Sequence, residues 1–388
     1  MMAAQFTKIV QIVPRLPPYT DGVGDYALQL AGELLERDRI LSEFLVFRPG
    51  PKNPNRIQEF PIHRLNQRDR DSILALIPED IAAVVLQYSN YPYLLGKLDT
   101  PSGLVHALET LKTRQNAPKI VVMFHELPTL RYRKIRCPNP IQRRVSRHLA
   151  RIADAIVTNN TAFQQTLSRW SSAQIQCIPN FSTIGEPEKT VPLLSARDRT
   201  LIVFGSSDRS RIYRHNSKTL SQICQKLGIK KLYDIGRPLD LNFSSLDADV
   251  ETIETGFLPA AEVSKLLLSA IAGIFDYNRF PNNLSKSTVY AAYSAHGLLP
   301  ISNRHHLPPQ DGIIANRHYL ATPAIPDLGN QTDRTLSLLQ IIADSARSQY
   351  RTHSLAKCAG VFARCIQAGS AIARKTDQNA NVTTRVGQ

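Results

Sequence analysis

Cysteine is scarce in this sequence, and none of its five cysteines belongs to a C-x-x-C pair of the kind that holds zinc or works as a redox dithiol. An odd number of widely spaced cysteines also argues against a disulfide framework. We therefore expect a reducing compartment and a cytoplasmic protein. The cysteines are Cys137, Cys177, Cys224, Cys358 and Cys365.

Long apolar runs are absent as well. A membrane-spanning helix needs about 18 or more consecutive apolar residues, and the sequence contains no such run. The segment 1–13 carries a single lysine and a short apolar stretch with no small-residue cleavage site after it. This pattern predicts a first strand rather than a secretion signal.

Acidic residues are too few to balance the basic ones. The 388-residue chain has 47 lysines and arginines against 32 aspartates and glutamates, which gives a formal net charge of +15. This excess predicts attraction to something anionic, and charge alone leaves open a phosphorylated ligand, an acidic lipid surface or a nucleic acid. The apolar share of 43% is ordinary for a globular protein, and the length suits two domains.

Short apolar runs alternate with helical patterns in the first half of the chain. This alternation predicts a parallel sheet covered on both faces, forming an N-terminal Rossmann-like acceptor domain over residues 1–182. The expected strands are 8–13, 41–48, 82–89, 119–125, 155–160 and 174–179, and the expected helices are 25–37, 103–114, 141–152 and 161–170.

The alternation restarts after a polar segment, 183–199, which is expected to be a linker because it contains Gly185, Pro187 and Pro192 without periodicity. A second Rossmann-like domain, 200–350, is expected to bind the donor at the carboxyl ends of its strands. A C-terminal helix, 351–374, and a flexible tail, 375–388, would follow. The expected strands here are 201–206, 231–235, 272–277 and 298–302, and the helices are 215–227, 260–271, 285–296, 332–346 and 355–373.

A glycine-containing loop follows the first expected strand. Gly22 and Gly24 would let a ligand approach the backbone closely, and the helix N-terminus offers free N–H groups. Asp25 and Asp21 would repel a phosphate there, so a contact with a sugar hydroxyl is also open. The alternative is a tight turn with Asp21 as the helix N-cap.

His125 and Glu126 end the strand that begins at Lys119, at the carboxyl edge of the sheet. A histidine and a carboxylate at this edge could orient a sugar or move a proton. The alternative is a histidine with a purely structural role.

Arginines and a lysine follow strands of the second domain. Arg209 and Arg211 lie just after Gly205, and arginine in such a loop suits recognition of a phosphate. Ser285 is expected to cap the next helix, leaving Lys286 and Ser287 in a first turn that could hold an anion. The alternatives are solvated surface charge and a simple N-cap.

The segment 131–151 contains eight basic residues and no acidic one. Its helix, 141–152, places apolar side chains on one face and four arginines on another, a pattern that could lie on an anionic membrane. The alternative is an ordinary domain helix with a basic solvent face. The arginines are Arg143, Arg144, Arg147 and Arg151.

Taken together, these segments resemble the retaining, nucleotide-sugar-dependent glycosyltransferases of the GT-B fold (glycosyltransferase group 1, family 4-like), whose two Rossmann-like domains face a cleft. The resemblance covers most of residues 7–370. The matching segments are "DGVGDYA", "FHE", "CIPN", "VFGSSDRSR", "TGFLPAAEVSKLLLSAIAGIF" and "KSTVYAAYSAHGLLPIS".

The resemblance implies roles for particular residues. The glycine loop, Gly22 and Gly24, would lie over the donor diphosphate, His125 would contact the sugar, and Arg209 or Arg211 would bind phosphate. Family members also carry a pair of glutamates eight positions apart in the second domain, whereas residues 281–297 of this chain contain no acid. The donor is therefore held differently, or catalysis has been lost.

We expect a hexosyltransferase-like enzyme that moves a sugar from a nucleotide-diphospho-sugar to a glycan or lipid-linked hydroxyl acceptor, in polysaccharide or envelope glycan synthesis. His125, Glu126 and Asp25 are its candidate catalytic residues, and no cofactor or metal is expected. The alternative is a catalytically silent scaffold that binds a sugar nucleotide or glycan.

Other partners follow less directly from the sequence. An anionic membrane surface, on the inner face of the membrane, is open. No nucleic acid is expected as a partner, because the aromatic-interleaved basic motifs of RNA-binding sheets are missing. A dinucleotide-dependent enzyme is disfavoured because the loop lacks the third glycine of that fingerprint.

Overall fold

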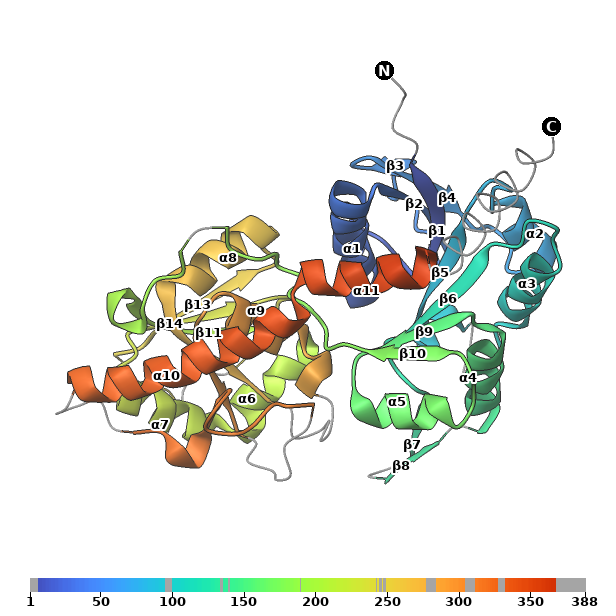
Figure 1. Cartoon of the computed structure of the whole chain (residues 1–388). Helices are drawn as coiled ribbons and strands as arrows, with labels where there is room; N and C mark the ends of the chain where they lie inside the picture. The colour runs from blue at the N-terminus through green and yellow to red at the C-terminus, as the bar shows by residue number, and fades with distance from the viewer. Residues whose placement is uncertain are drawn as a thin grey trace, which may run out of the picture. The chain divides into compact units, whose positions relative to one another are not determined.

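The chain folds into two compact units, each built on its own parallel sheet (Figure 1). The computed structural model describes residues 6–94, 100–132, 135–138, 140–188, 190–241, 243, 246, 249–276, 284–303, 311–326 and 332–367. Unit 1 comprises Met1–Thr158, Phe163–Cys177 and Cys358–Gln388, and unit 2 comprises Asn159–Ala162 and Ile178–Lys357.

The sheet of unit 1 has eight strands in the order β10-β9-β6-β5-β1-β2-β4-β3. Neighbouring strands run parallel except β3, which is antiparallel to β4. Successive side chains of a strand point to opposite faces of the sheet, and both faces are buried. Consecutive residues are therefore apolar, which gives the short apolar runs in the sequence. The strands are β1 Thr7–Val13, β2 Ile40–Val46, β3 Arg56–Ile57, β4 Phe60–Arg64, β5 Ala83–Tyr88, β6 Lys119–Phe124, β9 Ala155–Thr158 and β10 Gln174–Cys177.

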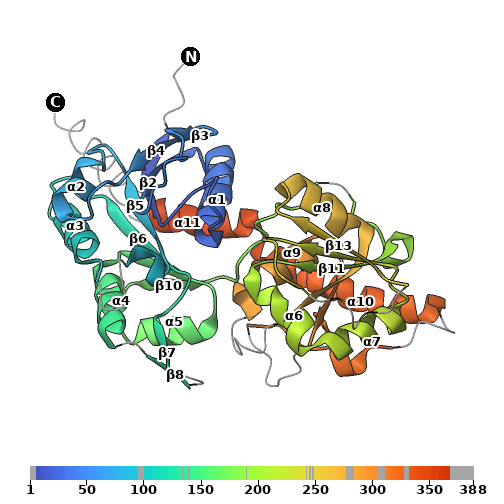
Figure 2. The same cartoon turned by 180° about the vertical axis from the view of Figure 1, so that it is seen from behind.

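Helices cover both faces of this sheet (Figure 2). Helix α1, Gly22–Asp38, packs Ala27 and Ala31 against Phe44 and Val46 on one face, and α11, Leu355–Gln367, lies on the same side. Four further helices pack against the opposite face. These are α2 Arg70–Ala75, α3 Ser102–Lys112, α4 Pro140–Ile152 and α5 Thr161–Ser168, with a hairpin of β7 Thr129–Tyr132 and β8 Ile135–Pro138 before α4.

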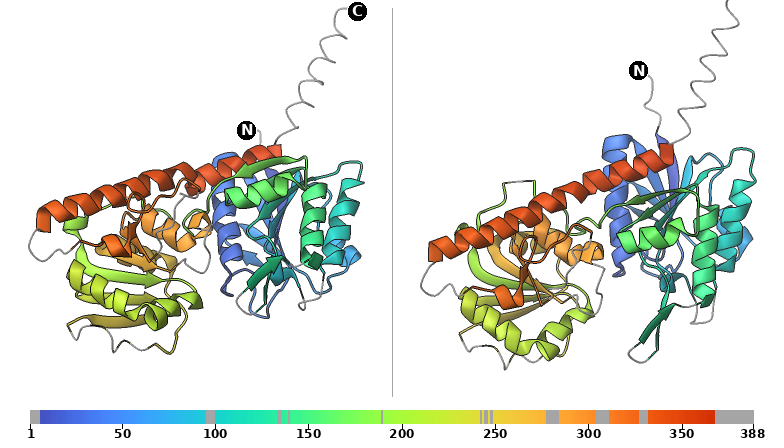
Figure 3. Two further views of the ribbon diagram at one scale, coloured as in Figure 1. Left: turned by 90° about the horizontal axis from the view of Figure 1, so that it is seen from below. Right: turned by 60° about the horizontal axis from the view of Figure 1, so that its bottom comes forward.

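The sheet of unit 2 has six parallel strands in the order β13-β12-β11-β14-β15-β16. Helices α6, α7 and α10 pack on one face, and α8 and α9 on the other (Figure 3). The strands are β11 Asp198–Phe204, β12 Lys231–Ile235, β13 Glu251–Gly256, β14 Ala270–Phe275, β15 Leu299–Ser302 and β16 Leu320–Ala321, and the helices are α6 Ser210–His215, α7 Ser217–Leu227, α8 Ala260–Ser269, α9 Thr288–Ala295 and α10 Thr332–Tyr350.

The predicted fold class, two Rossmann-like α/β domains, is confirmed, with two changes in detail. The C-terminal helix belongs to unit 1 from Cys358 on, so the chain crosses back to the first sheet. Helix α9 begins at Thr288 rather than at Ser285, because residues Leu284–Lys286 form a 3-10 turn before it. The expected tail, 375–388, and the end of the expected helix 351–374 lie outside the described residues.

Candidate functional site

The N-terminus of α1 lies at the carboxyl edge of the unit 1 sheet. Asp21 caps the helix, which was the alternative interpretation of this loop, and accepts hydrogen bonds from the backbone N–H groups of Val23 (2.9 Å) and Gly24 (3.1 Å). A Cβ on Gly22 would meet no atom within 4 Å, whereas a Cβ on Gly24 would lie 2.1 Å from the carbonyl oxygen of Arg15. The close approach of Arg15 thus requires a glycine at position 24, whereas Gly22 lies next to open space.

Asp25 lies in the first turn of α1, half-buried beside the capping carboxylate. Burial raises the pKa of Asp25 from its ordinary 3.8 to about 6, and the negative charge of Asp21 adds to the shift. A carboxyl group with such a pKa can exchange a proton near neutral pH. Asp25 therefore remains a candidate general acid or base.

His125 follows β6 and is brought against the first turn of α1. Its ring meets the ring of Tyr26 edge to face, with centroids 4.9 Å apart. The imidazole is 6% exposed, and its Nε2 lies 2.9 Å from Oε1 of Gln87 on β5. Glu126, the next residue, is exposed. The two predicted neighbours thus differ in environment, and of the two only Glu126 is open to solvent.

Asn90 is a residue of this edge that the sequence analysis missed. It follows β5, is 1% exposed, and its Oδ1 accepts a hydrogen bond of 2.7 Å from the hydroxyl of Tyr88. Its Nδ2 is buried and has no hydrogen-bond partner among the described residues. A buried amide donor without a partner is unfavourable, and at a sheet edge it is a candidate for contact with a ligand.

Arg209, after β11 of unit 2, does not have the predicted role. Its side chain is 2% exposed and forms an ion pair of 2.6 Å with the equally buried Asp234 of β12. All five N–H groups of the guanidinium are engaged, by Asp234 and by the backbone carbonyls of Gly205, Ser206 and Arg237. Since no donor is left, the prediction that Arg209 binds phosphate directly is wrong. It instead joins the carboxyl ends of β11 and β12.

Arg211 is better placed to meet an anion. Its side chain is 31% exposed, and its Nε donates to Oδ2 of Asp276 over 3.3 Å, where Asn216 also donates. Among the described residues, its two terminal amino groups make no hydrogen bond. Asp276, at the end of β14, was missed because no local pattern marks a single acid after an apolar strand.

The turn before α9 also differs from the expectation. Ser287, not Ser285, caps the helix, accepting from the backbone N–H of Tyr290 over 3.0 Å, and Ser285 instead donates to Oδ2 of Asp311 over 2.7 Å. Lys286 therefore lies before the helix and is half-buried. A Cβ on Gly205, whose φ is +130°, would lie 3.0 Å from a methyl carbon of Val289 in the first turn, so the loop after β11 and the start of α9 are adjacent.

The four arginines of α4 are all exposed, while Gln142, Ser146, Leu149 and Ala150 form its buried side. Arg143 lies over the ring of Trp170, 5.6 Å from its centroid. Within the described residues, none of the four forms an ion pair with a carboxylate. The helix is thus a domain helix with a basic outer face.

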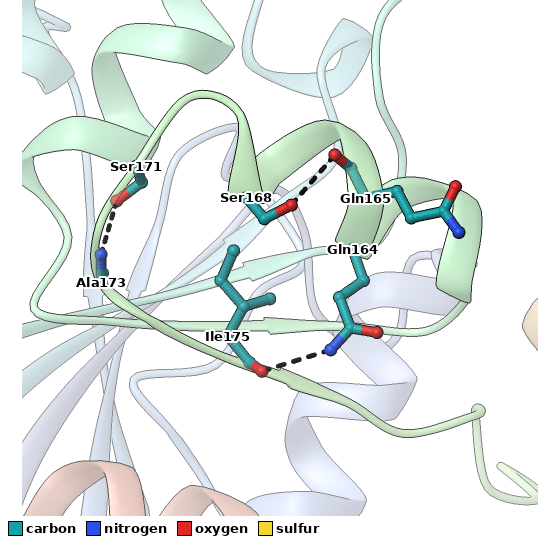
Figure 4. A pocket seen from close by; sticks show the side chains of 6 residues that line it. All are labelled: Gln164, Gln165, Ser168, Ser171, Ala173 and Ile175. Atoms are coloured by element: carbon teal, nitrogen blue, oxygen red, sulfur yellow. Dashed lines mark hydrogen bonds between the residues drawn. The ribbon is translucent and has the colours of Figure 1, made fainter.

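A shallow hollow of about 350 Å³ lies between α5 and β10 of unit 1 (Figure 4). Its polar groups bond to one another, for example Oγ of Ser168 to the carbonyl of Gln165 over 3.1 Å. It contains no titratable side chain, so it offers hydrogen bonds but no proton transfer. The lining residues are Gln164, Gln165, Ser168, Ser171, Ala173 and Ile175.

The described residues offer neither a cluster of metal ligands nor a membrane-spanning helix. No group of three or more histidine, cysteine, aspartate or glutamate side chains is placed to hold a metal ion within the described ranges. No helix in the described part of the chain combines the length and the apolar character that a membrane span requires.

Comparisons with known proteins agree with this architecture. No protein-family model and no curated protein sequence matches the chain. Solved structures match over nearly the full length. An alpha-glucosyltransferase in complex with UDP-glucose and DNA containing an abasic site has a TM-score of 0.58 at 10% identity and covers 90% of this chain and 95% of its own.

Two other matches come from named bacteria. An alpha,alpha-trehalose 6-phosphate synthase from Burkholderia multivorans has a TM-score of 0.54 at 11% identity, covering 95% of this chain and 100% of its own. A putative UDP-N-acetylglucosamine 2-epimerase from Listeria monocytogenes has a TM-score of 0.56 at 13% identity, covering 94% of this chain and 96% of its own. At such identities the likeness concerns the fold, and the chain therefore has the GT-B fold of two parallel-sheet units.

Proposed function

We propose that this chain is a glycosyltransferase that moves a sugar from a nucleotide-diphospho-sugar to a hydroxyl acceptor. The observation that carries the proposal is Arg211, a partly exposed arginine at the carboxyl edge of the unit 2 sheet, whose two terminal amino groups make no hydrogen bond within the described residues. Ligands of open α/β sheets bind at this edge. The matched glucosyltransferase and trehalose 6-phosphate synthase support the reaction class.

In the proposed reaction, unit 2 holds the donor. Arg211 would stabilise the negative charge that develops on the departing nucleoside diphosphate, assisted by Lys286 and by the start of α9 near Gly205. Arg209 would act indirectly, since it holds the loop that carries Arg211. The arginine would balance charge in place of a metal ion, so we propose a metal-independent reaction. We also propose retention at the anomeric carbon, which is supported by the resemblance to the retaining glycosyltransferases.

Unit 1 would meet the sugar and the acceptor. Asp25, whose pKa is raised to about 6, is suited to exchange a proton with a hydroxyl. His125 would orient a hydroxyl by hydrogen bonding, and Glu126 is exposed and able to reach one. Glycans and lipid-linked sugars, as in polysaccharide or envelope glycan synthesis, supply acceptors of this chemistry.

The test is turnover of a panel of nucleotide-diphospho-sugars, with release of nucleoside diphosphate followed with and without glycan acceptors, and with a chelator present. We expect release with one donor, unaffected by the chelator. Arg211→Ala should lower it at least tenfold, since an electrostatic contact to the leaving group is worth ~10²-fold in rate. Lys230→Ala, which removes an exposed charge before β12 at the opposite edge of the same sheet, should leave it unchanged.

The products decide among the alternatives. A new glycoside with the anomeric configuration of the donor supports a retaining transferase. An epimerised nucleotide sugar without glycoside would point instead to the activity named for the Listeria monocytogenes match. Binding without any product in the presence of every acceptor would favour the silent scaffold.

We further propose that α4 attaches the protein to an anionic membrane surface on the cytoplasmic side. Its support is the exposed basic face formed by Arg143, Arg144, Arg147 and Arg151, and each basic residue near such a surface is worth about 1 kcal/mol. Sedimentation with anionic vesicles should exceed that with neutral ones and should be lost when all four are changed to glutamine. Equal sedimentation with both vesicles would refute this attachment.

A further inference from the structure

A chain of buried polar side chains crosses four strands of unit 1 and ends on His125. Ser42 of β2, Gln11 of β1 and Gln87 of β5 are each 0% exposed, and His125 follows β6. Because residues two apart in a strand share a face, Gln11 and Ser42 lie on the same face as Val13 and Phe44, which pack against α1. The polar chain thus lies inside an apolar layer.

Each link in this chain is a hydrogen bond of ordinary length. Nε2 of Gln11 donates to Oγ of Ser42 over 2.9 Å, and Nε2 of Gln87 donates to Oε1 of Gln11 over 2.8 Å. Oε1 of Gln87 then lies 2.9 Å from Nε2 of His125. An amide oxygen can only accept a hydrogen bond, so Nε2 of His125 must carry a proton.

We propose that Ser42, Gln11 and Gln87 are positioning residues that hold His125 with its proton on Nε2, so that Nδ1 is the nitrogen at which His125 accepts or releases a proton. The tautomer follows from the amide oxygen of Gln87, which faces Nε2 of His125. Its use, to orient a sugar or acceptor hydroxyl through a ring of fixed protonation and direction, rests on the proposed function.

Packing alone does not account for these residues. A buried amide without hydrogen-bond partners is unfavourable, so a fully buried glutamine is stable only where neighbouring groups donate to its oxygen or accept from its nitrogen. Gln11, Gln87 and Ser42 lie on adjacent strands between apolar side chains. Apolar side chains could fill the same space without needing any hydrogen-bond partner. The ring of His125 is also fixed on its other side by the edge of Tyr26 at an interplanar angle of 86°. Both contacts define one orientation of the imidazole.

The test is the tautomer of His125 in the full-length protein. Histidine-selective ¹⁵N labelling with long-range ¹H–¹⁵N correlation spectra, recorded at a pH where the imidazole is neutral, distinguishes a protonated from an unprotonated ring nitrogen. His125→Gln identifies the signal among the ten histidines. We expect Nε2 to be protonated and Nδ1 unprotonated in the unchanged protein, and the reverse would overturn the proposal before any variant is made.

Variants of the hydrogen-bonded side chains then test whether they set the tautomer of His125. Gln11→Met changes no residue in contact with His125, but it removes the hydrogen bond that holds the amide of Gln87. The amide can then turn, so we expect the ¹⁵N signals of His125 to move toward a mixture of both tautomers. Gln87→Glu keeps an acceptor facing His125 and should keep the Nε2–H form, whereas Gln87→Met should lose it. Leu86→Ala, on the opposite face of the same strand, opens a cavity but leaves the hydrogen-bonded side chains intact, so it should not change the tautomer of His125. An unaltered tautomer in both methionine variants would overturn the proposal.

Activity provides a second readout with a separate meaning. If a donor is turned over, Gln11→Met should lower kcat about tenfold with little change in KM, since misplacing a reacting group acts on the chemical step. If the unchanged protein turns over no donor, the proposed function fails while the tautomer measurement still decides the positioning role. Should a methionine variant fail to fold, Gln87→Glu and the unchanged protein still report the tautomer.

Discussion

Asp25 is a carboxyl group whose surroundings oppose its charge, and this makes stability depend on pH. Its native pKa of about 6 lies above the ordinary 3.8, so the folded state binds the proton more tightly than the unfolded chain does. Stability therefore falls as pH rises from about 4 to about 6, and the loss persists above that range. A unit of pKa corresponds to about 1.4 kcal/mol, which places the loss at about 2–3 kcal/mol.

Asp25→Asn should consequently raise the free energy of unfolding at pH 7 by about 2 kcal/mol and leave it unchanged below about pH 4. Urea unfolding across this range measures the difference. Glu36→Gln, at an exposed position of the same helix, is the matched control and should have no such pH dependence. A uniform gain at all pH values would mean that the carboxyl group is not the cause.

Arg209 and Arg211 are two residues apart, but their replacement by alanine should affect stability to very different extents. Arg209→Ala leaves the carboxylate of Asp234 buried without its partner, which lowers stability by about 3–5 kcal/mol. Arg211→Ala removes a partly exposed side chain and should change stability by less than about 1 kcal/mol. Denaturant unfolding of both variants measures this, and similar losses would contradict the roles assigned here.

The different environments of Arg209 and Arg211 could be predicted from the sequence only in part. Composition and position correctly predicted arginines at the carboxyl edge of the second sheet. They could not show which arginine faces solvent, because that depends on Asp234, which joins the loop only once β11 and β12 pair. The partner Gln87 of His125 was missed for the same reason, since it lies 38 positions away on another strand.

At the scale of elements, the two glycines at the start of α1 have different tasks. Gly24→Ala would force a methyl group to within 2.1 Å of the carbonyl oxygen of Arg15, so it should lower stability by about 1–3 kcal/mol through displacement of the loop. Gly22→Ala meets open space and should change stability by less than about 0.5 kcal/mol.

Thermal unfolding of both glycine variants provides the measurement, with donor turnover recorded in parallel. We expect Gly22→Ala to retain stability and to lose activity if a ligand passes close to this turn. Equal stability of the two variants would contradict the packing role of Gly24.

Elements with strong local signals were predicted well, and those that depend on distant partners were not. Lys231–Ile235 forms a strand with the expected bounds, and Asp21 caps α1, one of the two interpretations that the sequence left open. By contrast, the polar strand β13, Glu251–Gly256, has no apolar run and is stabilised by its pairing with β12. The shift of the cap from Ser285 to Ser287 likewise depends on Asp311, a tertiary partner.

At the scale of the whole molecule, the alternation of strands and helices was sufficient to predict two parallel sheets. It could not predict that the chain returns to unit 1 at Cys358, because an amphipathic helix does not specify which apolar surface it will cover. Its buried residues, such as Phe362 and Ile366, would suit either unit by composition alone. The return means that unit 1 is formed by segments from both the first and the last part of the sequence.

The most direct test of the central claim, that unit 2 binds a nucleotide-diphospho-sugar through Arg211, is the melting temperature measured against the concentration of each donor. A ligand that binds only the folded state stabilises it by about 2.7 kcal/mol at one hundred times its dissociation constant. We expect the melting temperature to rise with one donor, and to keep rising with its concentration, in the unchanged protein and in Lys230→Ala. In Arg211→Ala the rise should be lost. No rise with any donor, or an equal rise in Arg211→Ala, would contradict it.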